Sequence, residues 1–188
     1  MENFAHIKTV IGIILGLSIT HSLKGAIKII EHPTKIKPYW VQLLWGFYMF
    51  LSTVYFWWFE IHLSEVTDWT FFKYLFIITY TIIYYILAVM LFPEDTSDYK
   101  DYKNYFFYRK RWFFAFLAAL FVFDFFDTYI KGANYMARIE VPYLVRGVLH
   151  ISLCLVAMKS NKKTVQAAVV IIFLIYQIAW ICTYYLNG

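Results

Sequence analysis

Ionisable and amide side chains interrupt several long apolar stretches of the sequence, and these residues could do chemistry. Asp124 and Asp127 lie three positions apart, so a helix would carry both carboxyl groups on one face. Arg146 and His150 lie four positions apart and would also share a face. Ionisable groups inside a membrane are costly and usually face a bundle interior or a water-filled cavity. We therefore predict one outward-opening polar site inside the membrane, formed by Glu60, Asp124, Asp127, Arg146, His150 and Gln177.

The chemistry that this set offers is the handling of positive charge. Three carboxylates face a single arginine, which leaves surplus negative charge. Two carboxyl groups held close together cannot both ionise easily, so one of them could carry and release a proton. Histidine titrates near neutral pH in its ordinary state, which makes His150 a candidate gate or relay. The structural alternative is that Arg146 pairs with Asp124 or Asp127 and only fixes how the helices pack.

Metal, cofactor and enzyme chemistry receive little support from the sequence. His62, His150 and the carboxylates are suitable metal ligands, but no segment carries the His-x-x-x-His or Glu-x-x-His spacing, so a metal site stays an open question. G-x-S-x-G, H-E-x-x-H and Gly-rich phosphate loops are absent from the sequence, and no motif identifies a reaction. We expect no cofactor.

A second set of polar residues follows the first apolar stretch. His21, Lys24 and Lys28 are spaced so that they share one helix face, and Lys35 and Lys37 follow them closely. Such a face could bind a phosphate or an anionic lipid headgroup. The simpler interpretation is that the lysines extend to the headgroup region and only anchor the helix.

Residues 97–111 form the longest polar segment, and their spacing predicts a short amphipathic helix. Aromatic residues recur every three to four positions among basic ones, and Ser97 or Asp98 could cap the helix. We expect this helix to lie in the inner membrane interface, where its cations meet anionic headgroups or a cytosolic protein. The predicted surface comprises Tyr99, Lys100, Tyr102, Lys103, Arg109, Lys110 and Arg111.

The elements that must position these residues are transmembrane helices. The chain has 188 residues, of which 62% are hydrophobic and 15% charged, with a mean hydropathy of +0.58. Soluble domains carry about 45–50% apolar and about 25% charged residues, so disorder, nucleic-acid binding and an ordinary cytosolic enzyme are excluded. The apolar stretches have the length of membrane spans. They are Ile7–Ile30, Trp40–Leu63, Phe71–Phe92, Trp112–Ile130, Val141–Met158 and Thr164–Leu186.

The predicted fold is therefore a single all-α integral membrane domain over residues 1–188, a bundle of six transmembrane helices with an interfacial helix before the fourth. Basic residues gather in cytoplasmic loops. Twelve of the 17 Lys and Arg residues lie on one predicted side: Lys24, Lys28, Lys35, Lys37, Lys100, Lys103, Arg109, Lys110, Arg111, Lys159, Lys162 and Lys163. Four lie on the other side: Lys8, Lys73, Lys131 and Arg138. This distribution predicts that both termini face outward.

Two functions are compatible with this sequence. The first is a channel- or transporter-like protein whose outward polar site handles a proton, a cation or a small polar ligand. The alternative is a non-catalytic membrane sensor or accessory protein that engages a cytosolic partner through its basic inner face. In both cases the chain contacts anionic lipid headgroups, and the small size of the bundle favours a homo-oligomer.

Overall fold

The computed structural model describes residues 2–32, 37–95, 98–132 and 141–186, and within these ranges the chain is helical and contains no strand. The all-α prediction is thus confirmed. Within these described ranges, six α-helices and one short 3-10 helix, η1, follow one another. They are α1 (Glu2–Glu31), α2 (Trp40–Phe59), η1 (Glu60–Glu65), α3 (Phe71–Leu91), α4 (Tyr102–Ile130), α6 (Val141–Lys159) and α7 (Lys163–Leu186).

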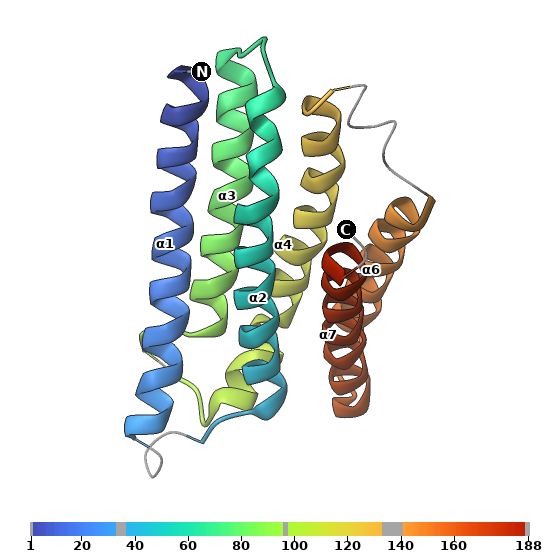
Figure 1. Ribbon diagram of the computed structural model, residues 1–188. Coiled ribbons are helices and arrows are strands. Elements are labelled where there is room, and N and C mark those ends of the chain that lie inside the picture. The colour runs from blue at the N-terminus through green and yellow to red at the C-terminus, as the bar shows by residue number, and fades with distance from the viewer. Residues whose placement is uncertain (1, 33–36, 96–97, 133–140, 187–188) are drawn as a thin grey trace.

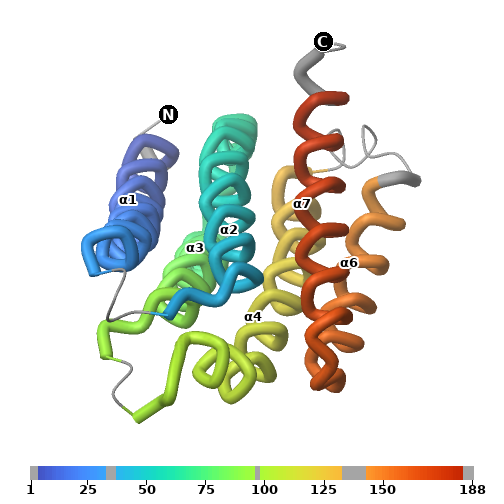
Figure 2. The backbone as a smooth tube through the Cα atoms, turned by 90° about the horizontal axis from the view of Figure 1, so that it is seen from below, coloured from blue at the N-terminus to red at the C-terminus, as the bar shows by residue number. Residues whose placement is uncertain are grey.

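The six α-helices run alongside one another as a bundle (Figure 1). Helix α1 packs mainly on α3, α4 on α6, and α2 on α7, while α3 and α4 join the two halves. Seen along the bundle, α6 and α7 lie at one edge and α1 at the other (Figure 2). We call the end that contains the start of α1, η1 and the end of α4 the upper end. The lower end contains the end of α3 and the turn between α6 and α7.

Helix α4 is longer than the predicted fourth span. It begins at Tyr102 and runs without a break to Ile130, so the amphipathic segment forms its first turns. Its N-cap is Asp101, whose side chain accepts a hydrogen bond from the backbone N–H of Asn104 at 2.7 Å. Asp101 is therefore the N-cap in place of the predicted Asp98, and Ser97, the other predicted cap, lies outside the described residues. At the other end Gly132 has a φ of +98°, in the left-handed region that glycine commonly adopts just after a helix.

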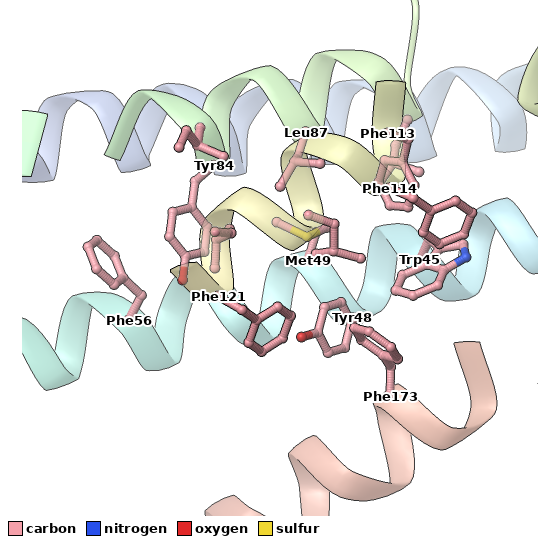
Figure 3. Packing of buried hydrophobic residues seen from close by; sticks show 14 of the residues in the cluster. Trp45, Tyr48, Met49, Phe56, Tyr84, Leu87, Phe113, Phe114, Phe121 and Phe173 are labelled. Atoms are coloured by element: carbon pink, nitrogen blue, oxygen red, sulfur yellow. The ribbon is translucent and has the colours of Figure 1, made fainter. Parts of the chain in front are cut away.

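The core of the bundle is aromatic. The ring of Trp45, on α2, is fully buried and meets the edges of Tyr48, Phe113, Phe114 and Phe173 at centroid distances of 5.0–5.5 Å. These rings come from α2, α4 and α7 (Figure 3). Edge-to-face contacts of this kind add to the stabilisation that burial provides. They hold three helices together in the lower half of the bundle.

Glycines allow two further close contacts between helices. A Cβ at Gly46 would lie 2.6 Å from the ring of Phe92, and a Cβ at Gly25 would lie 2.4 Å from the same side chain. A Cβ at Gly147 would lie 2.3 Å from the ring of Phe125. No side chain fits at such distances, so the phenyl rings rest directly on the backbone of the facing helix.

Four of the described helices are long and apolar enough to cross a membrane. They are Phe4–Glu31, Phe71–Leu91, Tyr102–Ile130 and Lys163–Thr183. The chain is therefore compatible with a multi-pass membrane protein. Helices α2 and α6, which are not among these four, carry many of the polar residues described next.

Candidate functional site

Two buried carboxylates share one buried lysine at the upper end. Lys131, directly after α4, lies 2.5 Å from Oδ2 of Asp127 and 2.9 Å from Oε1 of Glu60. All three side chains are at most 4% exposed. Asp127 lies one helical turn before Lys131, whereas Glu60 is the first residue of η1 and reaches the lysine from a different part of the bundle. We call these three residues the acidic triad.

Each carboxylate of the acidic triad keeps one oxygen without a hydrogen-bond partner. Oε2 of Glu60 and Oδ1 of Asp127 are buried, and no donor within the described residues reaches them. Leaving a buried acceptor unsatisfied costs about 1–3 kcal/mol, and more for a charged group. Each of these two oxygens can therefore bind a proton or accept a hydrogen bond from a water molecule.

Asp124 and Arg146 form a second, looser pair beside the acidic triad. Oδ2 of Asp124 lies 3.8 Å from Nη2 of Arg146, beyond hydrogen-bond distance. Tyr80 donates to Oδ1 of Asp124 at 3.3 Å, and Tyr143 donates to its backbone carbonyl at 3.0 Å. Asp124 is the more open of the two, with a quarter of its side chain exposed.

Aromatic rings surround the guanidinium group of Arg146. Its central carbon lies 5.2 Å from the ring centre of Trp180, 5.9 Å from that of Tyr143 and 6.0 Å from that of Phe121. These are distances at which a cation is attracted to an aromatic face. Trp180 is itself fixed by a hydrogen bond to the hydroxyl of Tyr55 at 3.0 Å. The rings therefore stabilise a positive charge that the long contact with Asp124 balances only in part.

A small cavity of about 20 Å³ adjoins Glu60 and the Asp124–Arg146 pair. Four of the six predicted site residues line it, namely Glu60, Asp124, Arg146 and Gln177. Residues with a hydroxyl group also line it, namely Tyr48, Ser52, Tyr55, Tyr80 and Tyr84. A cavity needs about 10–15 Å³ to hold a water molecule, so this one is large enough for water and too small for an organic ligand.

Glu60 also lines a second, larger pocket. This pocket of about 270 Å³ lies between the start of α1 and the end of α2, with Lys8, Trp57 and Trp58 in its wall. It opens to the surface at the upper end, whereas residues of α2, α3, α4, α6 and α7 line the small cavity. Glu60 thus lies in the walls of both the larger pocket and the small cavity.

One predicted site residue, His150, has different surroundings from those expected. His150 does not line the cavity; its Nδ1 donates to the carbonyl of Arg146 at 2.7 Å, and its ring packs on Phe121 and Phe173. Gln177 lines the cavity, and its buried Nε2 has no partner within the described residues.

Lys131 is absent from the residues that the sequence predicts for the site. It follows a predicted span and so belongs to the predicted basic loop residues. Its position four residues after Asp127 was a usable signal, since such spacing brings opposite charges together on a helix.

At the lower end, two of the residues predicted to bind an anion instead form hydrogen bonds to backbone carbonyl groups. His21 donates to the carbonyl of Phe92 at 2.7 Å, and Lys28 donates to that of Glu94 at 2.8 Å. Both therefore satisfy carbonyl groups that follow the end of α3. Lys24 and Lys37 are exposed, and Lys35 lies outside the described residues.

The predicted basic surface of residues 99–111 divides into exposed and buried members. Lys100, Arg109 and Arg111 are exposed, and Tyr99 and Lys103 are partly exposed. Tyr102 and Lys110 are buried and so do not belong to the surface. The ammonium group of Lys110 donates to the carbonyl of Ser160, just after α6. Lys110 thus caps a helix end.

Within the described residues, no three His, Cys, Asp or Glu side chains are grouped so that they could hold a metal ion. Comparisons of the chain with known protein families, with curated proteins and with solved structures find no match. Proposals about function therefore depend on the geometry of the chain itself.

Proposed function

We propose that all six α-helices cross the membrane, with the upper end outside and the first turns of α4 in the inner interface. Exposed apolar side chains on α2, among them Phe47 and Val54, and on α6, among them Val148 and Leu155, support lipid contact for these two helices as well. The excess of basic residues near the lower end supports a cytoplasmic location for that end.

We propose that the protein is a channel- or transporter-like membrane protein whose outer site binds and releases a proton. The observation that carries this proposal is the acidic triad, in which two buried carboxylates share one lysine and each keeps an oxygen without a partner. With both acids ionised the triad has a net charge of −1. Binding one proton makes it neutral, which burial strongly favours.

The size of the surrounding space favours a proton over larger cargo. The internal cavity admits water but no organic molecule, and the described residues offer no metal cluster. A proton needs only a chain of hydroxyl, carboxyl and water oxygens. In this proposal it enters through the upper pocket, binds at Glu60, and reaches Asp124 through the cavity. The position of Glu60 in both walls supports this route.

The aromatic core supports a proton route that is closed on its inner side. Below the cavity, the rings around Trp45 are buried and pack edge to face against one another. In this proposal the core is the barrier that must move, or be bypassed, before a proton passes to the inner side. His150 packs on Phe173, a member of this core, and so links it to Arg146.

Proton flux into liposomes tests the proposal. The purified protein is reconstituted with a pH-sensitive dye inside the vesicles, and an imposed potential drives the flux. We expect Asp127→Asn and Glu60→Gln to reduce any flux strongly, and Asp68→Asn, which removes an exposed acid at the same end, to leave it unchanged. Equal flux in all variants would refute the route.

Infrared spectroscopy gives a second measurement that does not require transport. A protonated buried carboxyl group has its own carbonyl band, which should be present in the resting protein near neutral pH. We expect this band to disappear or shift in Glu60→Gln or in Asp127→Asn, and to persist in Asp68→Asn. Absence of the band near neutral pH would contradict a bound proton in the triad.

A second candidate function is the membrane sensor or accessory protein. The exposed Arg109, Arg111 and Trp112 on the first turns of α4 favour it, because they offer a basic and aromatic face at the lower end. Replacing Arg109 and Arg111 by Gln should then abolish recruitment of a cytosolic partner, whereas Asp127→Asn should not. Lys110 is left intact in this test because it caps α6.

We also propose that the protein forms a homo-oligomer through α1, which lies at one edge of the bundle. Gly16 of its G-x-x-x-G motif has open space around it, whereas Gly12 lies against Trp57 of the same chain. Small residues let membrane helices approach closely. Native mass spectrometry should detect an oligomer that Gly16→Leu disrupts; a monomer before substitution would contradict the proposal.

A further inference from the structure

A hollow of about 410 Å³ opens at the lower end, where the first turn of α4 meets the start of α7. The side chains that give it its chemical character are polar or basic. They are Lys100, Lys103, Lys163, Asn104 and Asn161. The hollow is far along the bundle from the acidic triad, so it is independent of the proposed proton site.

The charges around the hollow do not balance. Three lysines line it, and Asp101 is the acid among the lining residues. The Asp101 carboxylate already accepts the backbone N–H of Asn104 as the N-cap of α4. None of the three lysines forms an ion pair within the described part of the chain. The lining residues thus carry a net charge of about +2 at neutral pH, since Lys and Asp are then ionised.

Two of the lysines reach the hollow from different helices. Lys103 lies in the first turn of α4 and Lys163 begins α7, and both line the hollow although both carry positive charge. Like charges repel, so free ammonium groups would normally move apart in water. An anion between them would turn this repulsion into two charge-assisted hydrogen bonds.

The backbone adds to the positive potential. Helices α4 and α7 both begin beside the hollow, at Tyr102 and Lys163. The first turn of a helix carries partial positive charge and backbone N–H groups that favour anions. The side chains of Asn104 and Asn161 provide additional hydrogen-bond donors.

We propose that this hollow binds a phosphomonoester dianion. A phosphate monoester carries a charge of about −1.5 to −2 at pH 7, which matches the surplus of the hollow. A phosphodiester headgroup carries a single charge and would leave part of the surplus unbalanced. The group could belong to a lipid with a phosphomonoester headgroup or to a soluble phosphorylated compound, and both present the same chemistry to the lysines.

Native mass spectrometry of the detergent-solubilised protein separates these sources. The first probe is phosphatidic acid, with phosphatidylglycerol and phosphatidylcholine as comparison lipids. The second probe is inorganic phosphate, added as a competitor and measured alone by phosphorus NMR with the protein in phosphatidylcholine nanodiscs. Retention of phosphatidic acid over both comparison lipids supports a lipid source. Phosphate binding without lipid preference supports a soluble source.

Matched variants test whether the hollow is the place where the probe binds. We expect Lys103→Gln with Lys163→Gln to weaken binding of the preferred probe by about tenfold or more. Lys159→Gln with Lys162→Gln removes the same charge from exposed lysines that do not line the hollow and should leave binding nearly unchanged. Equal weakening by both pairs, or no preference for a monoester and no phosphate binding, would overturn the proposal. Size-exclusion elution checks that each variant is folded.

Discussion

Lys131 is the residue on which the buried charges of the upper end depend. Its ammonium group contacts Asp127 in its own helix turn and Glu60 from another part of the bundle. Without it, two carboxylates would face each other in a space that water hardly reaches. Breaking a buried ion pair by removing one partner is costly, because the remaining charge stays desolvated.

We therefore expect Lys131→Met to lower the free energy of unfolding by about 3–5 kcal/mol. Thermal unfolding in detergent, followed by tryptophan fluorescence, measures the change. Adding Asp127→Asn should recover part of the loss, because the double variant has one buried charge fewer.

Lys73 provides the matched control for that experiment. It also pairs with an aspartate at the upper end, but Asp68 is 78% exposed. Surface pairs contribute little, so Lys73→Met should leave the unfolding temperature almost unchanged. Similar losses for Lys73→Met and Lys131→Met would show that burial does not determine the contribution of Lys131.

At the scale of helices, the lower ends of α3 and α6 are closed in the same way by side chains from neighbouring helices. Gln42, in the first turn of α2, donates to the carbonyl of Leu91, and Gln166, in the first turn of α7, donates to that of Ala157 at 2.8 Å. The first turns of α4 contribute Tyr105 to α3 and Lys110 to α6. Because Tyr105 and Lys110 bind carbonyl groups at the ends of α3 and α6, the amphipathic segment is continuous with α4 and partly buried.

The contact between α4 and α6 depends on the absence of a side chain at Gly147. We expect Gly147→Ala to destabilise the protein by about 1–3 kcal/mol, because its Cβ would lie 2.3 Å from the ring of Phe125. The unfolding temperature in detergent measures this. Gly12→Ala is the control: its Cβ would lie 3.7 Å from the ring of Trp57, an ordinary contact distance, and replacing a helical glycine by alanine stabilises by about 0.5–1 kcal/mol. A loss from both substitutions would contradict steric contact as the cause.

At the scale of the whole molecule, the orientation in the membrane is open to direct measurement. Cys154 is buried and Cys182 is exposed. On a Cys182→Ser background, a cysteine at Ser64, in η1, should react with a membrane-impermeant maleimide on intact cells. A cysteine at Asn161, between α6 and α7, should react only after the membrane is opened. The reverse pattern would place the acidic triad on the cytoplasmic side.

The order of the residues is enough to predict the helical architecture and the approximate helix positions. Apolar stretches long enough to cross a membrane indicate which segments are suited to contact with lipid. Proline, glycine and acidic residues indicate where helices end, as Gly132 does. Spacing along one helix was equally readable, which is why Asp124 and Asp127 could be assigned to one face.

Contacts between side chains of different helices could not be predicted in this way and are seen in the folded bundle alone. The bundle connects Glu60 to Lys131, closes the end of α6 with Lys110, and encloses His150 in aromatic rings beside the cavity instead of in its wall. Hydropathy and periodicity describe one segment at a time. The rotation of each helix about its axis, which selects the partner of each polar group, results from packing all the helices together.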